Sequence, residues 1–173
     1  MEIEVVNLYV VRCGLKFRTV AIVALTLCTT AIHAAPAGRV TDGVRIHATM
    51  QSTKVAAGSA MVVIGSLTNE RPGRMPLATT DPLGGFRVAV TGPGGHPVHM
   101  NASGRDLLKL VHRSKQQLAP GEKLEQSLWL SSLYDLKKPG KYTVTMMHDV
   151  PASNGVGNVT VKSEAVTVVV TKG

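Results

Sequence analysis

Short segments in which every second residue is apolar recur along the chain, and they limit its fold more than any other feature. The clearest is residues 44–50, where Val44, Ile46, Ala48 and Met50 alternate with polar residues. Successive side chains of a β-strand point to opposite faces of a sheet, so this alternation is typical of a strand with one buried face. Similar or more continuously apolar segments lie at residues 61–67, 86–90, 124–130, 142–146 and 166–170.

Turn-forming residues separate these segments at intervals of about eight to twelve residues, and no long segment has a helical period. This spacing predicts an all-β chain with seven or eight strands, arranged as an immunoglobulin-like antiparallel β-sandwich of Greek-key type. The four residues Gly92, Pro93, Gly94 and Gly95 predict a tight turn into residues 96–100.

Three further segments carry predictions of their own. Residues 61–67 are more continuously apolar than residues 44–50 and predict a central strand that is buried on both faces. Residues 107–112 fit either a strand or one helical turn, and we expect a strand. Residues 149–158 are rich in Pro, Ser, Asn and Gly, and we expect an exposed loop between the last two strands.

The N-terminal residues have the order of features that defines a signal peptide. Lys16 and Arg18 precede the uncharged residues 19–32, and small residues follow, with cleavage expected after Ala34 or Ala35. Residues 1–34 are therefore expected to be an extension and signal peptide that is removed, which leaves a single domain at 35–173. Both cysteines, at positions 13 and 28, lie in the removed segment, so we expect no disulfide in the mature protein. The expected location is secreted or periplasmic, with no membrane span after cleavage.

The charge and aromatic content of residues 35–173 argue against several classes of function. The full chain carries 19 basic and 11 acidic residues, and removing 1–34 leaves 19 − 3 = 16 basic and 11 − 2 = 9 acidic residues, a net charge of +7. The basic residues are spread along the chain and aromatic residues are few, which disfavours nucleic-acid binding. Apolar residues make up 44% of the chain, which disfavours a disordered chain.

A Pro-Gly turn directly before a strand-starting tyrosine, formed by Pro139, Gly140 and Tyr142, resembles the tyrosine corner of Greek-key sandwiches. In that motif the phenol hydroxyl bonds to backbone a few residues upstream. We therefore expect a structural role for all three residues.

Several motifs occur in an order that resembles a known family. They include Leu67-Thr68-Asn69, Pro82-Leu83-Gly84-Gly85-Phe86, Gly95-His96-Pro97-Val98, Leu118-Ala119-Pro120-Gly121-Glu122, and the stretch from Leu133 to Val144 with its Pro-Gly-Lys-Tyr. Together, over roughly residues 60–147, they resemble the immunoglobulin-like domain that precedes the catalytic domain in secreted deuterolysin-type and peptidyl-Lys zinc metallopeptidases. The resemblance implies a free-standing accessory domain that chaperones, inhibits or docks onto another protein, with a secreted peptidase as an expected partner.

Catalytic motifs are missing from the sequence. The peptidases of that family need His-Glu-x-x-His, and none of the six histidines here is followed by Glu. No serine has the Gly-x-Ser-x-Gly setting of a nucleophile elbow. We therefore expect a non-enzymatic protein that uses no cofactor.

A metal site is the alternative hypothesis. His96, His99, Met100 and His148 supply imidazoles and a thioether, which are ligands that suit copper. His96 and His99 fall on opposite faces of a straight strand, because their spacing is odd. We therefore expect no metal, and keep a periplasmic copper carrier as the second possibility.

The sequence as a whole predicts a secreted or periplasmic, non-catalytic protein-binding module. We expect its unidentified protein partner to contact a sheet edge or the segments 71–83 and 149–158.

Overall fold

The computed structural model describes residues 38–81, 83–110 and 112–173. The chain divides into two units, Met1–His33 and Ala34–Gly173, and the fold described here is that of the second. The predicted extension and signal peptide, with both cysteines, lie outside the described residues. No helix among the described residues is long and apolar enough to cross a membrane.

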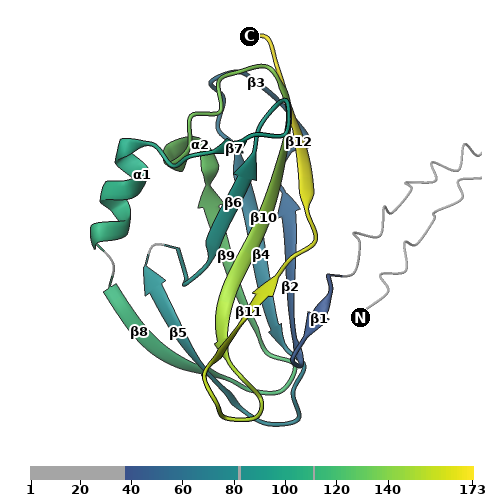
Figure 1. The fold of residues 1–173 in the computed structure, drawn as a ribbon, viewed down its shortest axis with the longest axis vertical. Coiled ribbons are helices and arrows are strands. Elements are labelled where there is room, and N and C mark those ends of the chain that lie inside the picture. The colour runs from purple at the N-terminus through teal and green to yellow at the C-terminus, as the bar shows by residue number, and fades with distance from the viewer. Residues whose placement is uncertain (1–37, 82, 111) are drawn as a thin grey trace, which may run out of the picture. The chain divides into compact units, whose positions relative to one another are not determined.

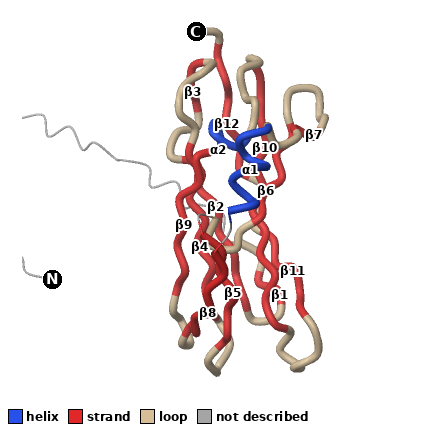
Figure 2. The backbone as a smooth tube through the Cα atoms, turned by 90° about the vertical axis from the view of Figure 1, so that its left-hand side faces the viewer, coloured by secondary structure: helices blue, strands red, loops and turns tan. Residues whose placement is uncertain are grey.

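Most of the strands belong to two sheets that face each other (Figures 1 and 2). The first sheet has the order β1 (Val40–Thr41), β2 (Val44–Met50), β4 (Val62–Asn69), β9 (Lys123–Trp129). The second has the order β3 (Lys54–Ala56), β12 (Val166–Thr171), β10 (Gly140–Pro151), β6 (Arg87–Thr91), β7 (Pro97–Val98), and β11 (Asn158–Lys162) also pairs with β10. A separate pair is formed by β5 (Met75–Asp81) and β8 (His112–Leu118).

The two sheets enclose one apolar core and form an immunoglobulin-like β-sandwich. Val44 and Ile46 of β2 and Val144 and Met146 of β10 are fully buried between the sheets. The chain crosses between sheets through α2 (Leu130–Leu133), so β9 and β10 are consecutive in sequence but lie in different layers. All the pairings are antiparallel except that of β12 with β3. The all-β sandwich predicted from the alternation is therefore confirmed.

The segments with strict alternation are strands, as predicted, and the 92–95 turn joins β6 to β7. The prediction for residues 61–67 was right in position, because β4 lies between β2 and β9. It was wrong in burial for most of one face: Ile64 is 37% exposed and Ser66 is half-buried, and only Val62, at the start of β4, is buried on that face. Since no layer covers that face of the sheet, most of its residues stay near the surface.

Residues 107–112 are not the strand we expected. Helix α1 (Ala102–Leu107) runs into the 3₁₀ turn η1 (Leu108–Leu110), and β8 begins only at His112. The cause lies upstream, because the Asn101 side chain accepts a hydrogen bond from the Gly104 N–H at 2.7 Å and starts the helix as an N-cap.

The expected loop at 149–158 is also shorter than predicted. β10 continues to Pro151 and β11 begins at Asn158, so only residues 152–157 form the turn between them. Its ends are joined by the Ala152 N–H donating to the Gly157 carbonyl at 3.0 Å. The second expected contact loop, 71–83, contains strand β5. The described residues thus form twelve strands, and the additional ones include the two- or three-residue strands β1, β3 and β7.

Candidate functional site

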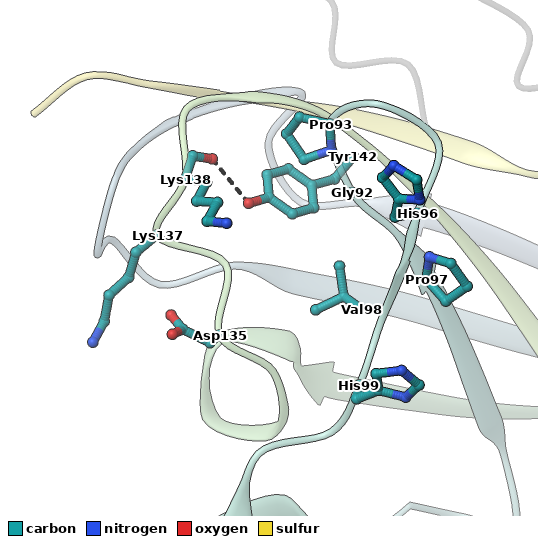
Figure 3. Close-up of a pocket in the computed structure, with 10 residues that line it drawn as sticks. All are labelled: Gly92, Pro93, His96, Pro97, Val98, His99, Asp135, Lys137, Lys138 and Tyr142. Carbon is teal, nitrogen blue, oxygen red and sulfur yellow. Dashed lines mark hydrogen bonds between the residues drawn. The ribbon is translucent and has the colours of Figure 1, made fainter.

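Tyr142 forms the hydrogen bond that the Pro-Gly-Lys-Tyr motif predicts. Its ring is 2% exposed, and its hydroxyl donates to the Lys138 carbonyl at 2.8 Å (Figure 3). Burial, together with the nearby Asp135 carboxylate, raises the pKa of Tyr142, so the hydroxyl keeps its proton. Gly140 has φ 142°, and a Cβ there would lie 2.5 Å from Cγ of Pro93. The motif therefore holds the start of β10 against the β6–β7 turn.

A hollow of about 380 Å³ lies beside this corner, between the β6–β7 turn and residues 135–138. His96 and His99 both line it (Figure 3). Val98 points toward Tyr142, whereas His99 points to the other side of the chain. Met100 does not line this hollow and packs instead against the core beside α1.

His148 lies apart from the other candidate ligands. It is 2% exposed, on the inner face of β10, and its ring meets Phe86 edge to face with centroids 5.3 Å apart. Its Nδ1 is 2.9 Å from the Asp149 carbonyl oxygen and its Nε2 is 3.3 Å from the Gly84 carbonyl oxygen. Burial is the main cause that lowers the pKa of His148, so the neutral ring is favoured.

The four predicted metal candidates are therefore not brought together. Met147, the residue before His148, pairs with Arg87 at the start of β6, whereas His96 lies beyond the end of β6. The five residues of β6 therefore separate His148 from His96 by roughly 15 Å along the sheet. Within the described part of the chain, no three His, Cys, Asp or Glu side chains are grouped so as to hold a metal ion.

The edge of the first sheet is formed by β9, and no other described strand pairs with its outer side. The Leu130 N–H donates to the Met61 carbonyl at 2.8 Å, and the Asn69 N–H donates to the Glu122 carbonyl at 3.1 Å. Bonded and non-bonded pairs alternate in an antiparallel ladder, so the even-numbered residues of β9 bond to β4. The backbone groups of the odd-numbered residues 123–129 therefore point away from β4, toward the free edge.

Trp129, at the end of β9, is 57% exposed and stands between two hollows. One, of about 340 Å³, has four leucines among its lining residues, Leu83, Leu107, Leu128 and Leu133. The other, of about 460 Å³, includes residues 60–62, and Trp129 lines both. We did not identify this surface from the sequence, although the alternation in residues 124–130 places Trp129 with the polar residues, on the outer face.

Comparisons with known proteins leave the family open. No family model matches the sequence, and no curated protein sequence is similar to it. The C-terminal domain of Wzt is 8% identical, with a TM-score of 0.48 over 79% of this chain and 78% of that chain. The CARDB domain of the PF1109 protein from Pyrococcus furiosus, a structure with di-metal ions, is 12% identical, with a TM-score of 0.44 over 79% of this chain and 90% of that chain. At TM-scores below 0.5, neither likeness carries an argument about this chain.

Proposed function

We propose that residues 35–173 form a non-catalytic protein-binding module of a secreted or periplasmic protein, and that the module binds its partner along β9. The observation that carries this proposal is the free edge of β9, which ends at the exposed Trp129. An edge strand presents unpaired N–H and C=O groups, with which an extended segment of a partner can pair.

Trp129 gives this edge an anchor. Tryptophan is enriched among the residues that contribute most to protein interfaces, because it buries a large apolar area. The two hollows beside it offer apolar walls for side chains of the partner. The Ser127 carbonyl accepts a bond from the Gln126 side chain at 3.3 Å, which a pairing strand would displace.

The partner class that we propose is a secreted peptidase. The support is the order of motifs over residues 60–147, which resembles the accessory domain of secreted zinc metallopeptidases, while His-Glu-x-x-His is missing from this chain.

Site-specific photo-crosslinking tests the proposal. A photoreactive phenylalanine analogue replaces Trp129 in one variant and Val156 in another, in the cells that produce the protein. Val156 is the matched control because it is 77% exposed but lies in the β10–β11 turn. We expect one discrete adduct, a secreted peptidase, from position 129 only. An absent adduct, or the same adduct from both positions, contradicts binding along β9, and an adduct with another kind of protein contradicts the partner class.

A second candidate function, a metal carrier, is favoured by one observation: His96 and His99 line the same hollow. A ligand at one hundred times its dissociation constant stabilises the native state by about 2.7 kcal/mol. Thermal melts with Cu(II), Cu(I) and Zn(II) should then shift upward, and His96→Ala should abolish the shift while His148→Ala retains it. A melt that is indifferent to all three ions excludes this function.

A further inference from the structure

A cleft opens in the second sheet because β5 leaves it. On one side of β10, β6 pairs with residues 143–147, and past Met147 no described strand continues the ladder on that side. β5 precedes β6 in the chain but pairs with β8 instead, and Figure 1 shows both strands diverging from β10. The result is a hollow of about 450 Å³ between β5 and β10.

Hydrogen bonds hold the backbone near two residues that line this cleft, Gly85 and Pro151. The Phe86 N–H donates to the Leu83 carbonyl at 2.9 Å in the turn that contains Gly85. Arg71 donates to the Pro151 carbonyl at 2.7 Å. Both bonds restrain the backbone that lines the cleft.

The backbone of β10 offers a donor to this cleft. The Ser163 N–H bonds to the Met146 carbonyl at 2.8 Å, so Met146 directs its backbone groups toward β11 and β12. Since direction alternates along a strand, Asp149 directs its N–H and C=O to the opposite side, into the cleft. The Asp149 carbonyl is contacted by His148 Nδ1 at 2.9 Å, and no described group bonds to its N–H.

Two arginines line the cleft, one from β6 and one from β8. Arg87 of β6 donates through one nitrogen to Asp149 at 2.5 Å and to Thr160 at 3.3 Å, which leaves its other donors without a described partner. Arg113 of β8 has no hydrogen-bond or ion-pair partner among the described residues. Asp149 is the one carboxylate among the described residues that line the cleft, so the two arginines leave a net charge of +1.

We propose that this cleft binds a carboxylate group of a peptide or protein ligand, held by the guanidinium of Arg113, the free donors of Arg87 and the N–H of Asp149. A guanidinium presents paired donors that match the two oxygens of a carboxylate, and a charge-assisted bond is about twice as strong as a neutral one. A peptide fits better than a free ion, because the cleft runs beside an unpaired strand edge. This site is independent of β9 and does not rest on the function proposed there.

Three blocked tetrapeptides test the proposal by NMR titration of ¹⁵N-labelled protein expressed from the full chain and exported. Acetyl-Ala-Val-Ala-Val with a free C-terminus offers a terminal carboxylate, its C-terminal amide offers none, and acetyl-Ala-Glu-Ala-Val-amide offers a side-chain carboxylate. We expect saturable shifts of the Gly85 and Asp149 amides with at least one of the two acids and none with the neutral amide. Whichever acid binds more tightly identifies the source of the carboxylate.

Two charge-matched variants complete the test. Arg113→Gln should weaken binding about tenfold or more, because it removes a charge-assisted pair. Lys115→Gln removes the same charge from the same strand but outside the cleft, and should change affinity less than about twofold. Equal losses in both variants, equal binding of the neutral amide, equal binding of inorganic phosphate, or no saturable shift with either acid would each overturn the proposal.

Discussion

The hydroxyl of Tyr142 is the single atom whose loss is easiest to interpret. Tyr142→Phe removes its bond to the Lys138 carbonyl and leaves the ring in place, so we expect the free energy of unfolding to fall by about 1 kcal/mol. Urea denaturation measures this. Tyr134→Phe is a matched comparison, because it also removes one hydrogen bond from a tyrosine hydroxyl to a backbone carbonyl, that of Val88 at 2.7 Å. An unchanged midpoint for Tyr142→Phe would contradict the structural role of the motif.

The buried imidazole of His148 makes stability depend on pH. Because burial lowers its pKa in the folded state, the unfolded chain binds a proton below about pH 6.5 while the folded chain does not. Stability should therefore be complete above that pH and should fall as the pH drops toward the folded pKa, by at most about 1.4 kcal/mol per pH unit. The charged groups that face the ring, Asp149 and Arg87, have opposing effects on its pKa.

Urea midpoints of wild type and His148→Gln between pH 7.5 and 5.5 isolate this contribution. Every other titrating group is shared by the two proteins, so the difference in slope belongs to His148. We expect the variant to lose less stability on acidification. Parallel slopes would refute the prediction.

At the scale of elements, helix α1 depends on close packing at one glycine. A Cβ at Gly104 would lie 2.5 Å from Cγ of Met100 and 2.7 Å from the Leu133 carbonyl oxygen of α2. Gly104→Ala should therefore displace α1 and lower the free energy of unfolding by about 1–3 kcal/mol, although alanine is the better helix former. Gly73→Ala, whose Cβ meets nothing within 4 Å, is the control, and equal stability of the two variants would contradict this packing.

The strands were predictable where alternation was strict, and the short helices were not. β2 and β10 follow the pattern throughout, because one face of each is covered by the core. The segment 107–112 has apolar residues that satisfy either period, and its conformation is decided upstream by the Asn101 cap. β11 was not predicted, although Val159, Thr160 and Val161 favour a strand, because it is short and directly follows the turn-rich segment 149–158.

At the scale of the whole molecule, Asp42 joins three loops that are distant in sequence. It accepts bonds from Arg71 at 2.8 Å and from both the N–H, at 2.8 Å, and the hydroxyl of Ser153. The Ser153 hydroxyl bond is the largest cause that lowers the pKa of Asp42. The stability that this carboxylate contributes should be present above about pH 4 and lost as the pH falls through its folded pKa.

Asp42→Asn should therefore lower stability at neutral pH and reduce its loss in acid. Asparagine tolerates the positive φ of 53° at this position, so the backbone is preserved. Asp106→Asn is the control, because its pair with Lys109 is exposed and contributes little. Acid denaturation followed by circular dichroism measures both, and identical acid midpoints for Asp42→Asn and wild type would contradict the prediction.

The candidate sites were less predictable than the strands. The Tyr142 contact is local, so a motif of a few residues was sufficient to predict it. The cleft between Arg87 and Arg113 depends on β5 pairing with β8 rather than with β10, which alternation within either strand cannot specify. The free edge of β9 likewise depends on strand order, which periodicity does not contain.

The position of β12 between β3 and β10 has a kinetic consequence. Val169 pairs with Lys54, 169 − 54 = 115 positions earlier, so the second sheet cannot close until β12 has been synthesised. Pairings of such long separation fold slowly. A chain that stops before β12 would lack an inner strand of this sheet, and β10 would then have an open edge along residues 140–144.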